Sequence, residues 1–430
     1  RILMLPWLAY GHTSPFVELA KALARRGFII YICSSPANLH SVRDSVSTAS
    51  VEFIELHLPE SRELPPRYHT TNGLPPHLMA DLKEALIRAR PGFAEILRSL
   101  NPDLVIYDFI QPWAAEEASS LGIPAVFFNI FGEASSSLFG HRLWRSESEY
   151  PFPAIHYRGH ELGFFNRIVD GFELLRGSVG RSSEIILVRT FRELEGKYID
   201  YHSELTKKRH VPVGHLVRDP EEAYDEEEEK KAECDAIMKW LDERTEKSTV
   251  FASFGTEYFL SDEEMEGIAG GLETSEANFI WVLTSHMGDD DDAPERLPDG
   301  FLRRTRSRGL VLAKWAPQLR ILSHRSVGGF LSHCGRSSVI EGLYCGVPIV
   351  ALPMHLDQPL NARLLTEAGL AEEASRTEEG KIDGMEVARA VKKAVSEESG
   401  EGLRRRVAEM SRVMKGKGEE EIGGAVEELL

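Results

Sequence analysis

The sequence predicts an α/β protein with two parallel, doubly wound sheets facing a central cleft. Strands and helices alternate along most of the chain, which is typical of parallel sheets. At 430 residues the chain is too long for one core. An acidic stretch, DPEEAYDEEEEKKAECD, separates two alternating series and is typical of a solvated linker. We therefore expect a first domain at 1–218, a linker at 219–236, a second domain at 237–410 and a C-terminal helix at 411–430 that packs back on the first domain.

The first alternating series opens with an apolar strand at 1–6. Ser14 is expected to cap the next helix, with Pro15 at its first position. Apolar residues then recur at helical spacing, at Phe16, Leu19, Ala20 and Leu23. Gly27 is expected to end this helix, and the elements that follow are a strand at 28–33, a strand at 104–107, a helix at 114–120 and a strand at 124–128.

The second series is expected to begin with a strand at 247–253. Ser261 and Glu264 have the spacing of a capping box at the start of a helix. Further strands are expected at 279–283, 309–313, 327–331 and 347–352. Ligands of doubly wound sheets bind beyond the carboxyl ends of the strands, so the side chains that follow these strands are candidates for a binding site.

Composition narrows the function classes. The net charge of −18 argues against nucleic-acid binding, because phosphate contacts need a basic face. No apolar run is long enough for a transmembrane helix, and no secretory signal is visible before the opening strand. The 4 cysteines lack the spacing of a metal site or a disulfide framework, which favours a reducing, cytoplasmic setting.

Residues 315–358 carry the strongest functional signal. Trp315 and Gln318, just past an expected strand end, combine an aromatic plane with an amide, which suits a flat heterocycle. His333 and Gly335 lie where the next strand turns into a helix. Glycine lets the backbone approach a ligand closely, and a helix N-terminus offers N–H groups and a positive dipole end. This point of the chain therefore predicts a phosphate site.

The residues that follow extend this pattern. Ser337 and Ser338 place hydroxyls in the first turn of the helix, and Glu341 is spaced to accept hydrogen bonds from a ribose diol. Asp357 and Gln358, after the next strand, suit sugar hydroxyls. Each feature alone is also typical of packing or of helix capping. Taken in this order, heterocycle, phosphate, ribose and sugar predict a nucleotide-sugar site.

This stretch resembles the signature box of the plant family 1 UDP-glycosyltransferases, and the resemblance extends over essentially the whole chain. Four further tracts are similar to the branch of that family that attaches a sugar to a sugar already present on a plant natural product: MLPWLAYGH at 4–12, YHTTNGLPPHL at 68–78, FRELEGKYIDY at 191–201 and PLNARL at 359–364. The resemblance implies a GT-B fold, with the UDP-sugar donor held by the C-terminal domain and a small-molecule glycoside, such as that of a flavonoid or terpenoid, as acceptor. We expect a monomer.

The resemblance also implies roles for individual residues. Trp315 would stack on uracil, Gln318 would bind the uracil and ribose side, and Glu341 would hold the ribose diol. Thr256, which stands where the family usually has serine, would hold the diphosphate with His333 and Ser338. The full donor-binding set is Thr256, Trp315, Ala316, Gln318, His333, Gly335, Arg336, Ser337, Ser338, Glu341, Asp357 and Gln358. The helix start stabilises the leaving diphosphate in this scheme, so no metal or other cofactor is expected.

His12 and Asp108 form a second constellation. Each follows an expected strand, so the fold can bring an imidazole beside a carboxylate that fixes its tautomer. A lone histidine at such a place more often has no catalytic role. The resemblance implies that His12 is the general base and Asp108 its partner, in a single displacement that inverts the anomeric carbon.

Arg336 departs from the family pattern, which has tryptophan there and asparagine at the position of Ser337. A guanidinium suits a carboxylate, and in some family members an arginine at this position goes with UDP-glucuronic acid. Contact with phosphate alone, or packing of the arginine stem, is the alternative. Glucose and glucuronic acid both remain open as the donor sugar, with a pentose or rhamnose behind them.

The acceptor site is poorly encoded in the sequence. Candidates from the first domain are aromatic residues that are equally plausible in the core: Trp7, Phe109, Trp113, Phe131 and Phe139. Two alternatives to the glycoside-extending transferase stay open. The enzyme would act directly on an aglycone, or the chain would be a non-catalytic nucleotide-sugar-binding protein.

Overall fold

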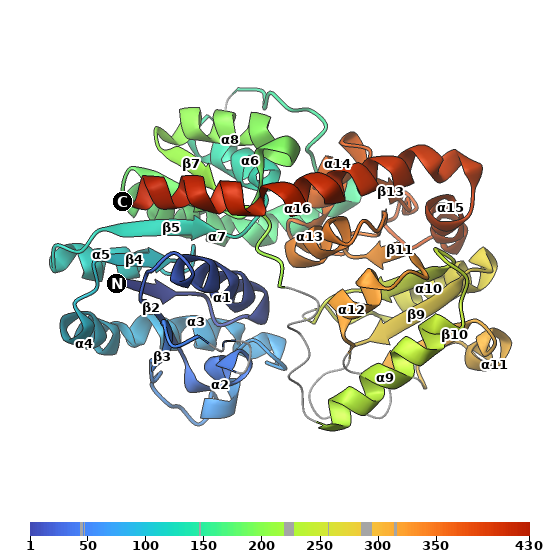
Figure 1. The fold of residues 1–430 in the computed structure, drawn as a ribbon, viewed down its shortest axis with the longest axis horizontal. Coiled ribbons are helices and arrows are strands. Elements are labelled where there is room, and N and C mark those ends of the chain that lie inside the picture. The colour runs from blue at the N-terminus through green and yellow to red at the C-terminus, as the bar shows by residue number, and fades with distance from the viewer. Residues whose placement is uncertain are drawn as a thin grey trace. The chain divides into compact units, whose positions relative to one another are not determined.

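The computed structural model describes residues 1–43, 46, 48–145, 148–218, 228–256, 258–284, 295–313 and 316–430, with the side chains at 164–170 and 228–230 left out. The chain forms two compact units (Figure 1). The first unit contains Arg1–Pro151, Ile168–Arg218 and Lys417–Leu430, and the second contains Phe152–Arg167 and Asp219–Gly416. Each unit has one parallel sheet, which confirms the predicted pair of doubly wound sheets.

The first sheet has 7 strands in the order β3-β2-β1-β4-β5-β6-β7. Their bounds are Ile2–Leu5 (β1), Ile30–Ser34 (β2), Val51–Glu55 (β3), Leu104–Tyr107 (β4), Ala125–Asn129 (β5), Ile185–Val188 (β6) and Arg209–Pro212 (β7). The order reverses direction at β1 and β4, where Leu5 pairs with Tyr107. Ligands of doubly wound sheets bind at such a switch point, so the residues that follow β1 and β4 are brought together there.

Helices of the first unit pack on both faces of this sheet. They are α1 (Tyr10–Ala24), α2 (Pro36–His40), α3 (Met79–Arg88), α4 (Arg90–Leu100), α5 (Pro112–Ser120), α6 (Glu133–Trp144) and α8 (Arg192–Thr206), with the short helices η2 (Pro66–Tyr68) and η3 (Pro76–Leu78). Helix α7 (Leu162–Arg181) begins within the segment of the second unit and ends in the first.

The predicted start of the first helix was wrong. Ser14 is not its cap, because α1 begins at Tyr10 and contains Pro15 in its interior. A proline there costs the helix one backbone hydrogen bond. A buried contact before the proline offsets this loss, because Thr13 is completely buried and its Oγ1 accepts from Asn38 Nδ2 at 2.8 Å. As a consequence, His12 lies in the first turn of a helix rather than in a loop.

The second sheet has 6 strands in the order β10-β9-β8-β11-β12-β13. Their bounds are Thr249–Ser253 (β8), Asn278–Leu283 (β9), Gly309–Ala313 (β10), Val327–Ser332 (β11), Ile349–Ala351 (β12) and Ala371–Glu373 (β13). All five predicted strands are present, and β13 adds an edge strand that the sequence did not reveal. The strand order of the second sheet also reverses, between β8 and β11. This reversal places the residues after these two strands at a second switch point.

The helices of the second unit are α9 (Glu228–Asp242), α10 (Asp262–Ser275), α11 (Phe301–Thr305), α12 (Gln318–Ser323), α13 (Arg336–Tyr344), α14 (Gln358–Glu367), α15 (Gly384–Val395), η4 (Gly159–Glu161), η6 (Glu398–Gly400) and the first part of α16 (Glu401–Leu429). The predicted capping box is confirmed, with Glu264 N–H donating to Ser261 Oγ at 3.2 Å and Ser261 N–H donating to Glu264 Oε2 at 3.0 Å.

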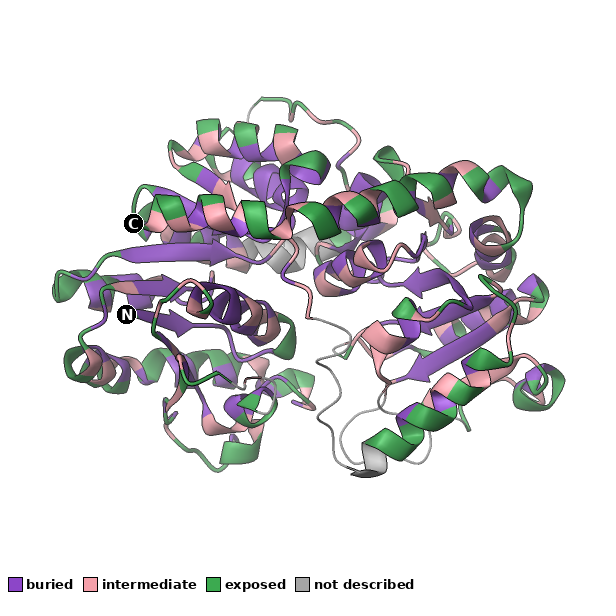
Figure 2. Ribbon diagram, viewed as in Figure 1, coloured by how far each residue is buried: buried purple, intermediate pink, exposed green. Residues whose placement is uncertain are grey.

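Each unit has its own core, formed by buried strands and the apolar faces of the helices around them (Figure 2). In the first unit that core includes Ile422 and Ala425 of α16. The salt bridges Arg26–Glu419 and Arg209–Glu428 fasten the same part of the helix to the unit. Phe152–Arg167 belongs to the second unit, although the sequence-based division assigned it to the first. Among the helices described, none has the length and apolarity needed to cross a membrane.

Candidate functional site

His12 and Asp108 meet at the switch point of the first sheet. Asp108 directly follows β4, and His12 lies in the first turn of α1 beyond β1. The distance between His12 Nδ1 and Asp108 Oδ2 is 2.7 Å. The carboxylate also accepts the backbone N–H groups of Trp7 at 3.1 Å and Phe109 at 2.7 Å. Because a carboxylate only accepts, His12 donates its Nδ1–H, and Nε2 carries the lone pair.

Two of the predicted acceptor-site aromatics lie beside His12. The ring centroid of Phe109 is 5.9 Å from that of His12, and Phe131 contacts it edge-on at 5.8 Å. Both phenylalanines are half-buried, so they combine an apolar surface with access to solvent. The other three candidates, Trp7, Trp113 and Phe139, are buried and belong to the core.

His333 occupies a tight slot at the switch point of the second sheet. It follows β11 and is held between two glycines, Gly255 and Gly335. A Cβ at these glycines would lie 2.8 and 2.4 Å from His333 Nε2, so no larger residue fits without displacing the imidazole. Burial, and after it the charge of His355, lowers the pKa of His333 to about 4. The imidazole is therefore neutral at pH 7.

The other phosphate-site residues lie at the start of α13. Gly335 is the N-cap residue and Arg336 begins the helix, with Ser337 and Ser338 in its first turn. Arg336 and Ser338 are buried. Thr256 is exposed just beyond β8, the strand that pairs with β11. The fold thus gathers these residues at one edge of the second sheet, where the free N–H groups of a helix N-terminus favour an anion.

The residues predicted for the nucleoside are also neighbours. Gln318 begins α12, and its amide nitrogen donates to Glu341 Oε2 at 2.8 Å and to Ser338 Oγ at 3.4 Å. Ala316 precedes it in a tight turn, with its carbonyl accepting the Gln318 N–H at 2.8 Å. Trp315 lies outside the described residues. The amide and the carboxylate thereby fix each other's orientation before any ligand arrives.

Asp357 ends the turn between β12 and α14, and Gln358 is the first residue of α14. Gln358 Oε1 accepts the backbone N–H groups of Met354 at 3.1 Å and His355 at 3.0 Å, so the amide nitrogen is the end that can donate to a ligand. Asp357 Oδ2 accepts from Asn361 Nδ2 at 2.9 Å. A donor and an acceptor therefore stand side by side, as sugar hydroxyls require.

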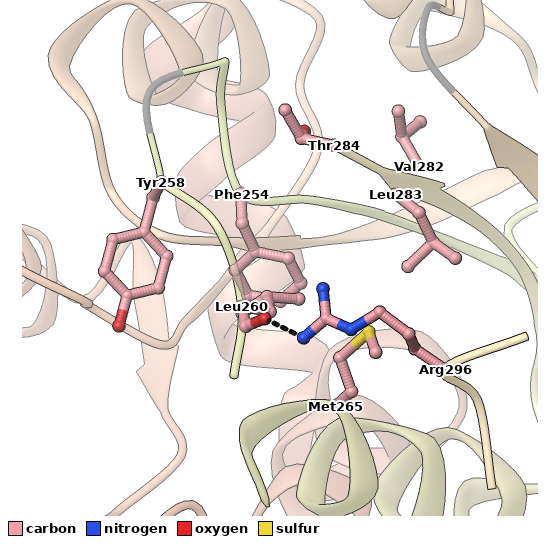
Figure 3. Close-up of a pocket in the computed structure, with 8 residues that line it drawn as sticks. All are labelled: Phe254, Tyr258, Leu260, Met265, Val282, Leu283, Thr284 and Arg296. Atoms are coloured by element: carbon pink, nitrogen blue, oxygen red, sulfur yellow. Dashed lines mark hydrogen bonds between the residues drawn. The ribbon is translucent and has the colours of Figure 1, made fainter. Parts of the chain in front are cut away.

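A pocket at the ends of β8 and β9 was not among the predicted sites. It is small, and it is lined by Phe254, Tyr258, Leu260, Met265, Val282, Leu283, Thr284 and Arg296 (Figure 3). Arg296 crosses it and donates to the Leu260 carbonyl at 2.7 Å. The only signal for this pocket in the sequence is that most of its lining residues follow two expected strands.

A second histidine–carboxylate group in the first unit was also missed. Glu133 Oε2 lies 2.8 Å from His202 Nδ1 and 3.3 Å from His210 Nδ1. One potential ligand atom from each of the three residues lies within 4.8 Å of the others. They come from α6, α8 and β7, and no spacing in the sequence links them.

One switch point carries a histidine–carboxylate pair, and the other has a helix N-terminus whose N–H groups favour an anion. This arrangement fits the class of two-domain nucleotide-sugar enzymes with the GT-B fold. Residues 226–426 match the family described as UDP-glucoronosyl and UDP-glucosyl transferase, and residues 1–216 match the glycosyltransferase N-terminal domain. The chain therefore belongs to the UDP-glycosyltransferases of plant family 1.

Individual relatives agree with this assignment. UDP-glucosyltransferase 29 of Panax ginseng is 50% identical, over 100% of this chain and 96% of its own. Cyanidin-3-O-glucoside 2-O-glucuronosyltransferase of Bellis perennis is 43% identical, again over 100% and 96%. Among solved structures, Glycyrrhiza uralensis UGT73P12 complexed with glycyrrhetinic acid 3-O-monoglucuronide has a TM-score of 0.86 at 22% identity, covering 100% of this chain and 95% of that one. This last match shows the fold.

Proposed function

We propose that this UDP-glycosyltransferase transfers glucose or glucuronic acid to a hydroxyl of a plant natural-product glycoside, with inversion at the anomeric carbon. The observation that carries the proposal is the 2.7 Å contact between His12 and Asp108 in a chain that also holds the donor signature. A silent nucleotide-sugar binder has no use for an oriented imidazole.

His12 is the general base in this proposal. Its Nε2 removes the proton from the acceptor hydroxyl as the oxygen attacks the anomeric carbon. Asp108 holds the imidazole through Nδ1 and stabilises the imidazolium that forms. Phe109 and Phe131 present apolar surface beside the base, which suits the body of a flavonoid or terpenoid.

The departing UDP is stabilised by the protein itself. The N–H groups at the start of α13 and the hydroxyls of Ser337, Ser338 and Thr256 supply hydrogen bonds to a diphosphate, in the place where other enzymes use a metal ion. His333 lies beside them, directly after β11. We therefore assign no cofactor to the reaction.

The glycoside acceptor is supported by relatives and by the tracts shared with the glycoside-extending branch. The Bellis perennis relative is named for transfer onto a glucoside. The 4 cysteines form no disulfide among the described residues, which fits a cytoplasmic enzyme. Nothing in this chemistry requires a second copy of the chain, so we propose a monomer.

The experiment is a UDP-release assay with UDP-glucose and UDP-glucuronic acid, on a flavonoid or terpenoid glucoside and on its aglycone. Transfer to the glucoside, with a product one sugar heavier by mass, supports the proposal. Preference for the aglycone would replace it by the direct transferase. No transfer with any combination, despite UDP binding, would leave a nucleotide-sugar binder.

Arg336 is proposed to read the donor sugar. If its guanidinium contacts a C6 carboxylate, Arg336→Trp lowers kcat/KM for UDP-glucuronic acid and raises it for UDP-glucose. A charged hydrogen-bonded pair is worth roughly 1.5–3 kcal/mol, so the ratio should move about ten- to a hundredfold. A competition between the two donors on one acceptor measures it. An unchanged ratio would make the arginine a phosphate or packing residue and favour UDP-glucose.

A further inference from the structure

The turn that carries Asp357 and Gln358 has an unusual backbone. Leu356, directly before them, has φ 55°, a left-handed conformation that a side chain with Cβ rarely adopts, and it is 41% exposed. Burial of its side chain therefore does not account for the conformation. Within the turn, Gln358 Oε1 holds the N–H groups of Met354 and His355. The carbonyl of Leu356 is held from outside the turn.

The residue that holds it is Tyr157. Its hydroxyl donates to the Leu356 carbonyl at 2.9 Å, from a position 199 residues earlier in the chain. Tyr157 belongs to Phe152–Arg167, the segment that the fold attaches to the second unit. Burial, followed by the negative charges of Asp357 and Glu161, raises the pKa of Tyr157 well above its usual range. The hydroxyl thus remains a donor over the whole working pH range.

Ion pairs, some of them buried, fix the segment in this place. Arg158 donates from both terminal nitrogens to Glu373, at 2.8 and 3.1 Å. Arg363, on the helix that Gln358 begins, contacts Glu373 at 2.8 Å and Glu161 at 2.7 Å. The side chains of Arg363 and Glu161 are 6% and 4% exposed, so these pairs are shielded from solvent. These ion pairs therefore hold the segment Phe152–Arg167 against α14 and β13.

We propose that Tyr157 is a positioning residue for the donor sugar, acting through the Leu356 carbonyl on Asp357 and Gln358. The inference rests on the proposed function, in which those two side chains bind the sugar hydroxyls. Without the tyrosine hydroxyl, the left-handed turn loses the hydrogen bond that opposes its strain. The acceptor and donor groups beside it then move away from the sugar. The residues proposed for uracil, ribose and diphosphate lie on other segments, after β8 and β11 and on α12 and α13.

The test is Tyr157→Phe, which keeps the ring and removes only the hydroxyl. One neutral hydrogen bond predicts a loss of about three- to tenfold in kcat/KM for the UDP-sugar. The inhibition constant of UDP, which lacks the sugar, should stay within about twofold by the same reasoning. Tyr201→Phe is the matched control, because its hydroxyl bonds His141 in the first unit. It should leave both constants unchanged.

Asp357→Ala separates this inference from the proposed function. If it weakens UDP-sugar use but not UDP binding, while Tyr157→Phe does nothing, the positioning role is overturned and the sugar assignment stands. If Asp357→Ala leaves UDP-sugar use unchanged, the sugar assignment fails, and the inference with it. Equal weakening of UDP and UDP-sugar by Tyr157→Phe would also overturn the inference, because it would show general damage to the unit.

Discussion

The first unit contains two groups in which a carboxylate meets imidazoles, and they differ in access. In one, Asp108 is 1% exposed and His12 is 16% exposed. In the other, Glu133 is fully buried between His202 and His210, each 1% exposed. The same chemical groups therefore serve different ends. A general base needs one ring nitrogen that a substrate can reach, and burial removes that possibility.

The buried group is closed on every side by the protein. Glu133 Oε1 accepts from Asn129 at 2.8 Å, and His210 Nε2 lies 3.1 Å from the Thr206 hydroxyl. A Cβ on Gly140 would lie 2.8 Å from His202 Nε2, so the backbone of α6 covers that nitrogen. This group links α6, α8 and β7, and we assign it to the stability of the unit rather than to the reaction.

The largest effect expected from this contrast is on His12. His12→Ala should lower kcat by about 10²–10⁴-fold, because the general base is lost. UDP binding should survive, since the proposed nucleotide residues all lie in the second unit. Steady-state kinetics measure kcat, and calorimetry measures UDP binding. A kcat within a few-fold of wild type would show that the base lies elsewhere.

Asp108→Asn is expected to be slower by up to about 10⁴-fold, because the amide holds the wrong tautomer of His12. The amide has nearly the same shape but does not stabilise the imidazolium. Circular dichroism should show a folded protein. Unfolding of the variant would assign Asp108 to the fold, like Glu133, and erase the distinction between the two groups.

Acid is expected to destabilise the protein through its buried histidines. Burial lowers the pKa of His210 and of His333, the latter to about 4, so the folded state binds fewer protons than the unfolded state below pH 6.5. The contribution of these two histidines to the free energy of unfolding is complete above pH 6.5. It is lost as the pH falls toward the pKa values that the histidines have in the folded state. For His333 alone the loss at pH 5 is roughly 2 kcal/mol.

Thermal unfolding between pH 7.5 and 4.5 measures this effect. Tm should fall steadily over that range, and His210→Gln should make the fall shallower. A Tm that is flat down to pH 5 would contradict the assignment of neutral, buried imidazoles.

The smallest effect is expected from removal of metal ions. Excess chelator should leave the rate unchanged within error, because protein donors serve the diphosphate. Three potential ligand atoms in the Glu133 group make this worth measuring. Loss of activity that added magnesium, manganese or zinc restores would show a metal requirement and give the buried group a different meaning.

The sequence predicted the features that depend on local pattern. Apolar runs located the strands, and Ser261 with Glu264 located a helix start. The expected strand ends then predicted which residues lie near each other, and the structure brings His12 to Asp108 and Gln318 to Glu341. Residues joined only by tertiary packing were invisible. Glu133 and His202 are 69 positions apart, and Arg363 and Glu161 are 202 apart, without any periodic signal between them.

Pro15 shows the opposite error, a local rule overruled by packing. Proline is favoured in the first turn of a helix, and that rule placed the start too late. Before the proline, Thr13 is completely buried and accepts a hydrogen bond from Asn38 at 2.8 Å, which holds the additional first turn in place. One backbone hydrogen bond is worth about 1 kcal/mol, so buried tertiary contacts can offset its loss.

The attachment of α16 to the first unit has a consequence for biosynthesis. Ile422 and Ala425 complete a core whose strands lie at Ile2–Leu5 through Arg209–Pro212. On the ribosome, the first sheet is made before any residue of the second, yet its core stays open until the second sheet has been translated as well. The part of that core which Ile422 and Ala425 cover therefore stays exposed on the nascent chain until α16 has been made. Chaperones that bind such surfaces have their longest opportunity during that interval.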